Sequence, residues 1–188
     1  MEYNMKFVTI GYIEWRKGQD ILVDAICGLP ENFVSGCKFT MIGQDSSLMA
    51  QKLREKILYK PWIEMIGTVK REKIHEILAQ TDVMICPSRE DPMPTVCAEA
   101  MMHNVPCLVS DSIGTASYIK DGYDGLIFNN EDVNNLQKKI IWCIEHKEEI
   151  RKMGARAYTI YDKVFSVKAF ENSLLKHVSE MLEGADRQ

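Results

Sequence analysis

Short apolar runs recur along the chain, and each is followed by a segment whose apolar residues have helical spacing. The first three runs end in a glycine, at Gly11, Gly43 and Gly67. The predicted strands are residues 6–11, 39–43, 63–67, 83–86, 105–110 and 126–128. Strands that are apolar throughout and alternate with amphipathic helices are typical of a parallel sheet with helices on both faces. We therefore expect an α/β fold built on a Rossmann-like parallel sheet of about six strands.

The same periodicity places the helices between and after these strands. The predicted helices are residues 19–29, 47–58, 70–80, 133–144, 147–158 and 167–182. No linker or internal repeat divides the chain, and its 188 residues, 46% of them hydrophobic, are enough to bury one core. We expect a single domain that spans residues 1–188.

Ligands of such sheets bind beyond the carboxyl ends of the strands, so the loops at that edge are candidate binding loops. The first candidate is residues 12–18, which carry the adjacent cations Arg16 and Lys17 just before a predicted helix. The amino end of a helix already favours negative charge, so an anion would bind well there. From these residues alone, a solvated basic pair at the surface is an open alternative.

The second candidate loop is residues 87–101, which follow the apolar run 83–86. Two carboxylates, Asp91 and Glu99, bracket a turn that Pro92 and Pro94 stiffen. The second half can form a helix, and the amides at its start would attract a phosphate. An ordinary surface connection between a strand and a helix is the alternative.

Charge and composition exclude several classes of function. The net charge of -4 and the pI near 5.6 give no general attraction to nucleic acid, so we expect no nucleic-acid partner. Six scattered cysteines form no CxxC pair, which predicts free buried thiols in a reducing cytoplasm and no metal site. No apolar run approaches the roughly 20 residues of a transmembrane segment, so the expected location is cytoplasmic.

In order and spacing, these elements resemble the carboxyl-terminal, donor-binding half of GT-B glycosyltransferases, in the large retaining family that uses nucleotide-diphosphate sugars. The resemblance covers nearly the whole chain. Its motifs are residues 7–11, 16–18, 66–69, 87–101, 105–110 and 121–127, together with Gly114. It implies the second lobe of the GT-B fold and a function in polysaccharide or glycoconjugate synthesis.

The resemblance also implies roles for particular residues. The acids Asp91 and Glu99 would hold hydroxyls of the transferred sugar and of the ribose, and Lys17 would balance charge on the leaving phosphates. These three would form the catalytic set, and the donor would also be bound by Arg16, Gly67, Thr68, Val69, Thr95 and Val96. Among these, the turn 67–70 resembles the family's base-binding segment, with an ordinary turn at the end of a strand as the alternative. The expected donor is a UDP- or GDP-sugar, with no obligatory metal or other cofactor.

Three residues depart from the family pattern. Asp91 stands where glutamate is usual and is one methylene shorter, which bears on the choice of sugar. Tyr12 stands where many members have an arginine, so we expect Arg16 to supply the second phosphate cation. Pro94 replaces a frequent glycine and lacks an N–H, so Thr95 and Val96 must donate more of the hydrogen bonds to phosphate.

The resemblance covers only one of the two lobes of such an enzyme. A glycan or lipid acceptor would bind through an absent amino-terminal lobe. If that lobe binds a membrane, the enzyme would act at the inner face of that membrane. The isolated domain would be inactive. The C-terminal helix, within residues 163–188, would pack on that lobe. Two alternatives stay open: a non-catalytic nucleotide- or protein-binding module, and a nucleotide-sugar epimerase, which would need carboxylates or histidines in the cleft. The four histidines are expected to be surface or packing residues.

Overall fold

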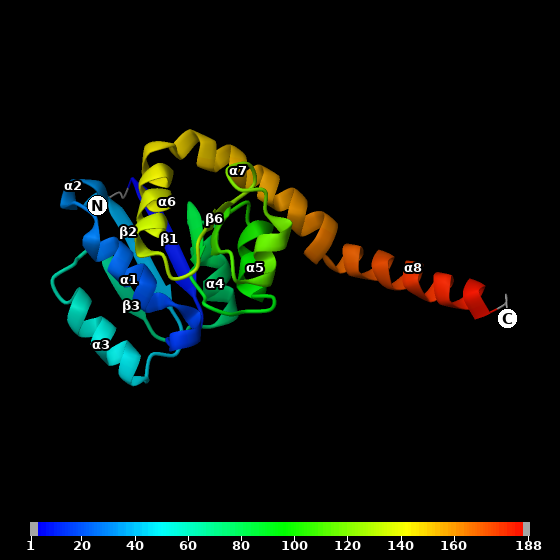
Figure 1. Cartoon of the computed structure of the whole chain (residues 1–188), viewed down its shortest axis with the longest axis horizontal. Helices are drawn as coiled ribbons and strands as arrows, with labels where there is room; N and C mark the ends of the chain where they lie inside the picture. Colours follow the sequence, from blue (N-terminus) through cyan, green and yellow to red (C-terminus); the bar gives the residue numbers. More distant parts are fainter. Residues whose placement is uncertain (1–3, 186–188) are drawn as a thin grey trace.

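Six parallel strands form one sheet in the order β3-β2-β1-β4-β5-β6, as seen in a computed structural model that describes residues 4–185 (Figure 1). The strands are β1 (Met5–Ile10), β2 (Cys37–Ile42), β3 (Ile63–Ile66), β4 (Val83–Cys86), β5 (Cys107–Ser110) and β6 (Leu126–Phe128). The predicted α/β class and the six strands are confirmed. Residues 1–3 and 186–188, the ends of the predicted domain, lie outside the described residues.

Helices cover both faces of this sheet. They are α1 (Gln19–Gly28), α2 (Glu31–Val34), α3 (Leu48–Ile57), α4 (Arg71–Leu78), α5 (Thr95–Met102), α6 (Val133–Glu145), α7 (Lys147–Ile160) and α8 (Val167–Ala185). One core lies between the sheet and α1, α3 and α6, and a second lies between the sheet and α4 and α5. Helix α7 contributes buried side chains to both cores.

Two of the predicted helix starts are fixed by side-chain caps. The hydroxyl of Ser47 accepts a hydrogen bond from the amide of Ala50 at 3.0 Å, and the Asp132 carboxylate accepts one from Asn135 at 2.9 Å. Residues 111–116 predict a turn that starts a short helix, and the 3-10 turn η2 (Gly114–Tyr118) forms there. The 3-10 turn η1 (Trp15–Lys17) and the π turn η3 (Tyr161–Phe165) escaped prediction. They are too short to show a hydrophobic period.

The strand order reverses between β1 and β4. The chain leaves β1 toward α1 on one face and leaves β4 toward α5 on the other, so the loops after these two strands diverge around a crevice at the carboxyl edge. Their backbones nevertheless touch, because the amide of Arg89 donates to the carbonyl oxygen of Arg16 at 2.9 Å. This edge therefore holds both predicted binding loops.

Gly18 makes this close approach possible. It is left-handed, with φ of 68°, and a Cβ added there would lie 1.9 Å from the carbonyl oxygen of Pro87. Any side chain at this position would push the start of α1 away from the end of β4.

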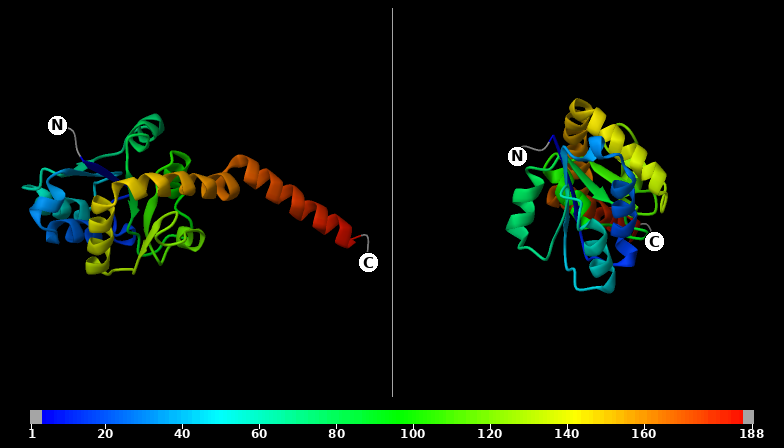
Figure 2. Two further views of the ribbon diagram at one scale, coloured as in Figure 1. Left: turned by 90° about the horizontal axis from the view of Figure 1, so that it is seen from above. Right: turned by 90° about the vertical axis from the view of Figure 1, so that its left-hand side faces the viewer.

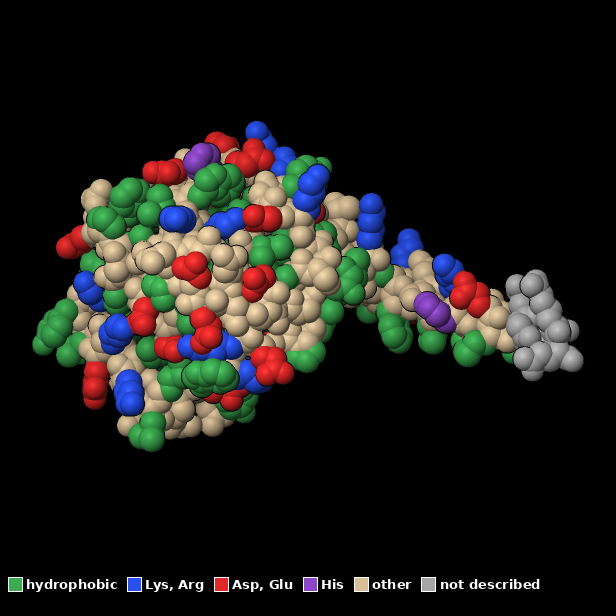
Figure 3. Space-filling model, in the orientation of Figure 1, with side chains coloured by type: hydrophobic (Ala, Val, Ile, Leu, Met, Phe, Trp, Pro, Cys, Tyr) green, Lys and Arg blue, Asp and Glu red, His purple; other side chains and the backbone are tan. Residues whose placement is uncertain are grey.

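Helix α8 projects from the body of the molecule (Figure 2). Large exposed apolar side chains run along it: Val167, Phe170, Leu174, Leu175, Val178, Met181 and Leu182. They lie on one side, with basic side chains opposite (Figure 3). Within residues 4–185, no helix has the length and apolar character needed to cross a membrane.

We expect Gly18→Ala to lower the free energy of unfolding by about 3 kcal/mol or more, since left-handed strain alone costs about 1–2 kcal/mol and the added methyl also collides with backbone. Gly122→Ala is the matched control, because its φ is 77° but nothing lies within 4 Å of the added Cβ. Urea unfolding measures both. Equal losses in the free energy of unfolding would show that the contact between Gly18 and the carbonyl oxygen of Pro87 adds no cost.

Candidate functional site

A cleft of about 330 Å³ opens at the carboxyl edge, between the ends of β1 and β4. We call it the edge cleft. It is lined by Ile10, Gly11, Tyr12, Arg16, Lys17, Asp91, Met93, Pro94, Thr95 and Val96. Five predicted site residues are thus brought together: Arg16, Lys17, Asp91, Thr95 and Val96.

The edge cleft contains an ion pair between its two predicted catalytic groups. Lys17 Nζ lies 2.5 Å from Asp91 Oδ2, and the two side chains are only 18% and 10% exposed. The other carboxylate oxygen of Asp91 accepts a hydrogen bond from the amide of Met93 at 3.3 Å, and its carbonyl oxygen accepts one from Gly114. Asp91 is therefore held by Met93 of its own loop and by Gly114, which follows β5, whereas Lys17 reaches it from the loop after β1.

The start of α5 forms the opposite wall. Thr95 and Val96 occupy the first turn, where amides have no carbonyl partner inside the helix, and the helix dipole makes this end positive. Pro94 precedes them and contributes no donor. The buried side chains of Cys97, Ala100 and Met101 fix this helix against the sheet, so the amides are aimed by packing.

A second hollow of about 210 Å³ adjoins the edge cleft, and we call it the side hollow. It is lined by Ile10, Gly11, Tyr12, Ile42, Gly43, Gln44, Thr68, Val69 and Ile74. The end of β1 is therefore a wall common to both spaces. Tyr12 is 59% exposed and reaches both, while its carbonyl oxygen accepts a hydrogen bond from Gln19 at 2.7 Å. Of the predicted base-binding residues, Thr68 and Val69 line this hollow and Gly67 directly precedes them.

Glu99 is placed differently from the other predicted residues. It lies in the second turn of α5, and its Oε1 is 3.5 Å from Nη2 of Arg71 at the start of α4. Its side chain is 22% exposed. Glu99 lines neither the edge cleft nor the side hollow. It faces α4.

Sequence reasoning assigned no role to Arg89, which fastens the two loops together. Its guanidinium donates to both oxygens of Asp20, at 2.9 and 2.8 Å, and to Glu131 and the carbonyl oxygen of Trp15, each at 2.6 Å. Hydrogen bonding to Asp20 raises the pKa of Arg89 further, so it stays charged. The signal in the sequence is an arginine three residues after the buried strand β4, because a cation so close to the core requires a partner.

Arg16 takes a more open position. It is 45% exposed and pairs with Glu14 at 3.1 Å, and its Nη1 lies 3.4 Å from the carbonyl oxygen of Glu90. It stands at the rim of the edge cleft and is more exposed than Lys17.

Comparison with known proteins identifies the family. A model described as glycosyl transferases group 1 matches residues 2–160. The chain belongs to this family. An uncharacterized glycosyltransferase from Methanocaldococcus jannaschii is 26% identical over 88% of this chain and 45% of its own length. The lipopolysaccharide glucosyltransferase WaaG of Escherichia coli K12 is also 26% identical, over 67% of this chain and 34% of its own.

Solved structures share the fold of this group 1 domain. Anabaena HepE in complex with UDP and glucose superposes with a TM-score of 0.82 and 20% identity, over 94% of this chain and 48% of HepE. The C-terminal domain of LpcC from Francisella tularensis has a TM-score of 0.79 and 16% identity, covering 87% of each chain. The predicted family and its Rossmann-like second lobe are confirmed. The chain spans less than half the length of the curated relatives named here.

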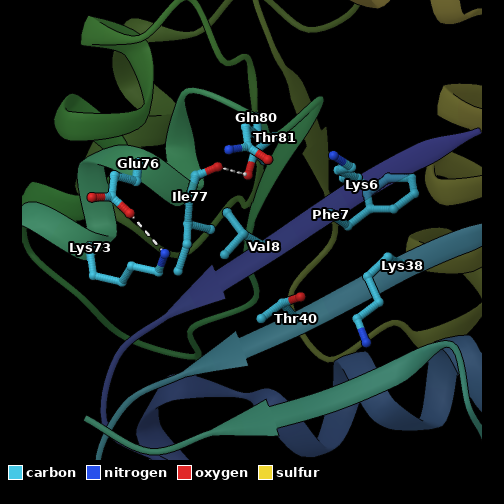
Figure 4. A pocket seen from close by; sticks show the side chains of 10 residues that line it. All are labelled: Lys6, Phe7, Val8, Lys38, Thr40, Lys73, Glu76, Ile77, Gln80 and Thr81. Carbon is cyan, nitrogen blue, oxygen red and sulfur yellow. Dashed lines mark hydrogen bonds and ion pairs between the residues drawn. The ribbon is translucent and has the colours of Figure 1, made fainter. Parts of the chain in front are cut away.

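Another hollow of this group 1 domain lies between α4 and the strands β1 and β2, with a volume of about 150 Å³ (Figure 4). It is lined by Lys6, Phe7, Val8, Lys38, Thr40, Lys73, Glu76, Ile77, Gln80 and Thr81. Lys73 pairs with Glu76 at 2.8 Å, and Lys38 pairs with Glu64. No predicted site residue lies there, so the family motifs point to the edge cleft instead.

The six cysteines are free thiols, and all but Cys27 are buried. Burial raises the pKa of Cys37 to about 11 and that of Cys143 to about 12, so both stay protonated at neutral pH. Within residues 4–185, no three histidine, cysteine or acidic side chains gather closely enough to hold a metal ion.

Proposed function

We propose that this chain is the donor-binding lobe of a retaining glycosyltransferase. The enzyme would move a sugar from a UDP- or GDP-sugar to a glycan or lipid acceptor in polysaccharide or glycoconjugate synthesis. One observation carries the proposal: the edge cleft combines a lysine, an aspartate and the unpaired amides that open α5. The complexes of Anabaena HepE with UDP and with UDP-glucose support a nucleotide-sugar donor.

The diphosphate would lie across the start of α5. The amides of Thr95 and Val96 would donate to its oxygens, and Lys17 and Arg16 would approach from the opposite loop. When the bond to the sugar breaks, negative charge grows on the leaving phosphate. Fixed cations and amides stabilise that charge without reorganising, which is electrostatic catalysis.

The ion pair between Lys17 and Asp91 would be the resting state of this site. Phosphate oxygens compete for Lys17, and an aspartate released from its cation can accept hydrogen bonds from sugar hydroxyls. Because Asp91 is also anchored to Met93 and Gly114, it would stay in place when Lys17 moves. Donor binding would therefore replace the ion pair between Lys17 and Asp91 with an ion pair between Lys17 and the phosphate.

The nucleoside would occupy the space between α5 and the side hollow. Glu99 would accept hydrogen bonds from both ribose hydroxyls, since a carboxylate has only acceptor sites and can hold two neighbouring donors. The base would then lie in the side hollow, with the backbone of Gly67, Thr68 and Val69 at its edge. Apolar walls from Ile42, Val69 and Ile74 suit a planar base.

The acceptor site would come from a lobe outside this chain. Rate acceleration in group transfer requires that donor and acceptor be held together, so the isolated domain would bind donor and transfer nothing. Helix α8 would pack on the other lobe, because its apolar stripe has no cover in the described structure.

Calorimetric titration with UDP tests the site. We expect Lys17→Ala to weaken UDP binding by about tenfold or more, since a charge-assisted hydrogen bond is worth about 1.5–3 kcal/mol. Glu99→Ala should abolish measurable binding. Asp91→Asn should strengthen UDP binding several-fold, because it removes the carboxylate that competes with phosphate for Lys17.

Lys152→Ala is the matched control, since Lys152 is an exposed lysine on α7 outside both spaces. It should leave the affinity unchanged. The proposal would be refuted if the wild-type protein gave no heat with UDP or GDP. It would also be refuted if neither Lys17→Ala nor Glu99→Ala changed the affinity for UDP.

Transfer is tested by comparing this chain with the same chain joined to an amino-terminal lobe. We expect product only from the joined protein, and NMR of that product should show the anomeric configuration of the donor sugar. An inverted product would contradict retention, and turnover by this chain alone would contradict its assignment as the donor half.

A further inference from the structure

Helices α4 and α5 are joined by two matched side-chain contacts. Arg71 reaches Glu99 at 3.5 Å, and Nδ1 of His75 lies 2.9 Å from Nε2 of His103. The partners on each side are four residues apart, with His103 at the C-cap of α5, so the two contacts are about one turn apart. We call this pair of contacts the α4–α5 ladder.

The ladder connects the two halves of the proposed donor site. Helix α4 follows the 67–69 segment directly, and its Ile74, adjacent to His75, lines the side hollow. Helix α5 carries Glu99 and the amides of the edge cleft. The spacing of these helices therefore sets where the ribose anchor stands relative to the base pocket.

The two contacts are unequal. Arg71 is 75% exposed and its distance to Glu99 is long, and such a surface pair contributes little stability. The histidine pair is partly buried and has ordinary hydrogen-bond length, with the rings 5.2 Å apart between centroids. The histidine contact is therefore the one that fixes the spacing.

We propose that His75 and His103 are positioning residues, whose hydrogen bond holds α4 against α5 and thereby orients Glu99 toward the donor. This inference rests on the proposed function, because it takes Glu99 as the ribose anchor. Neither histidine lines the edge cleft or the side hollow, so neither is assigned a contact with the donor.

The contact depends on protonation. A neutral pair has one donor nitrogen and one acceptor nitrogen, and a single proton leaves that match intact because an imidazolium can donate to an imidazole. A second proton leaves two donors facing each other, and the bond is lost. Within residues 4–185, the charges that act on His103 come from His75 across the ladder and Glu99 one turn back. Arg71 flanks Glu99.

Burial, followed by the proximity of His75, lowers the pKa of His103 below its usual 6.5, and Glu99 opposes the shift. The folded protein thus binds this proton less readily than the unfolded chain. The hydrogen bond is therefore complete above about pH 6.5, and it is lost at a lower pH, where the second proton binds.

The test is UDP titration of this chain at about pH 7.5 and about pH 5.0, so that the lower value lies well below the usual histidine pKa. His103→Gln keeps a donor and an acceptor near Nε2 but cannot titrate. We expect the wild type to lose at least about fivefold more affinity between the two pH values than His103→Gln does. Protonation of the diphosphate affects every variant alike, so the difference isolates the histidine.

Two further variants complete the test. His177→Gln removes an exposed histidine on α8, so its pH profile should match the wild type. At the higher pH, His103→Ala should bind UDP about fivefold more weakly than the wild type, whereas His103→Gln should bind it with wild-type affinity. Identical pH profiles for the wild type and His103→Gln, or wild-type affinity in His103→Ala, would overturn the inference. Wild-type affinity in Glu99→Ala would instead overturn the proposed function.

Discussion

The contact between the loop after β1 and the loop after β4 is the interaction on which the edge cleft depends. Arg89, with a side chain only 10% exposed, reaches back from the second loop to Asp20 and to the backbone of Trp15. Gly18 lets the two backbones meet without a side chain between them. Together they place Lys17 and Asp91, which are 74 residues apart in sequence, within hydrogen-bond distance.

The charges that would attract a phosphate to the edge cleft are local ones. A chain of net charge -4 does not attract anions by its overall field, so the positive potential must come from a few cations and from the start of α5. Lys17 and Arg16 both begin paired with acids, and the α5 amides begin without helix partners. A phosphate ligand would accept hydrogen bonds from these amides and would compete with Asp91 for Lys17. Such a site would bind a phosphate at one place, whereas the net charge of the chain would not attract anions.

The sequence was sufficient for the architecture and for placing most of the predicted site residues at one edge of the sheet. Apolar strands, glycine-ended turns and helix starts such as Ser47 are local signals, whereas the strand order was first seen in the structure. Tertiary packing decides which side chains come into contact at the edge of the sheet. No local sequence pattern predicts these contacts. The pairing of Lys17 with Asp91, the turning of Glu99 toward α4, and the meeting of His75 with His103 therefore required the structure.

We propose that the diphosphate of a nucleotide binds in the edge cleft, at the start of α5. The most direct measurement is a two-dimensional NMR titration of the ¹⁵N-labelled chain with UDP. We expect the amide signals of Thr95 and Val96 to shift most, together with those of Gly11 and Lys17. Shifts confined to the hollow between α4 and the strands β1 and β2, with the start of α5 unmoved, would contradict it.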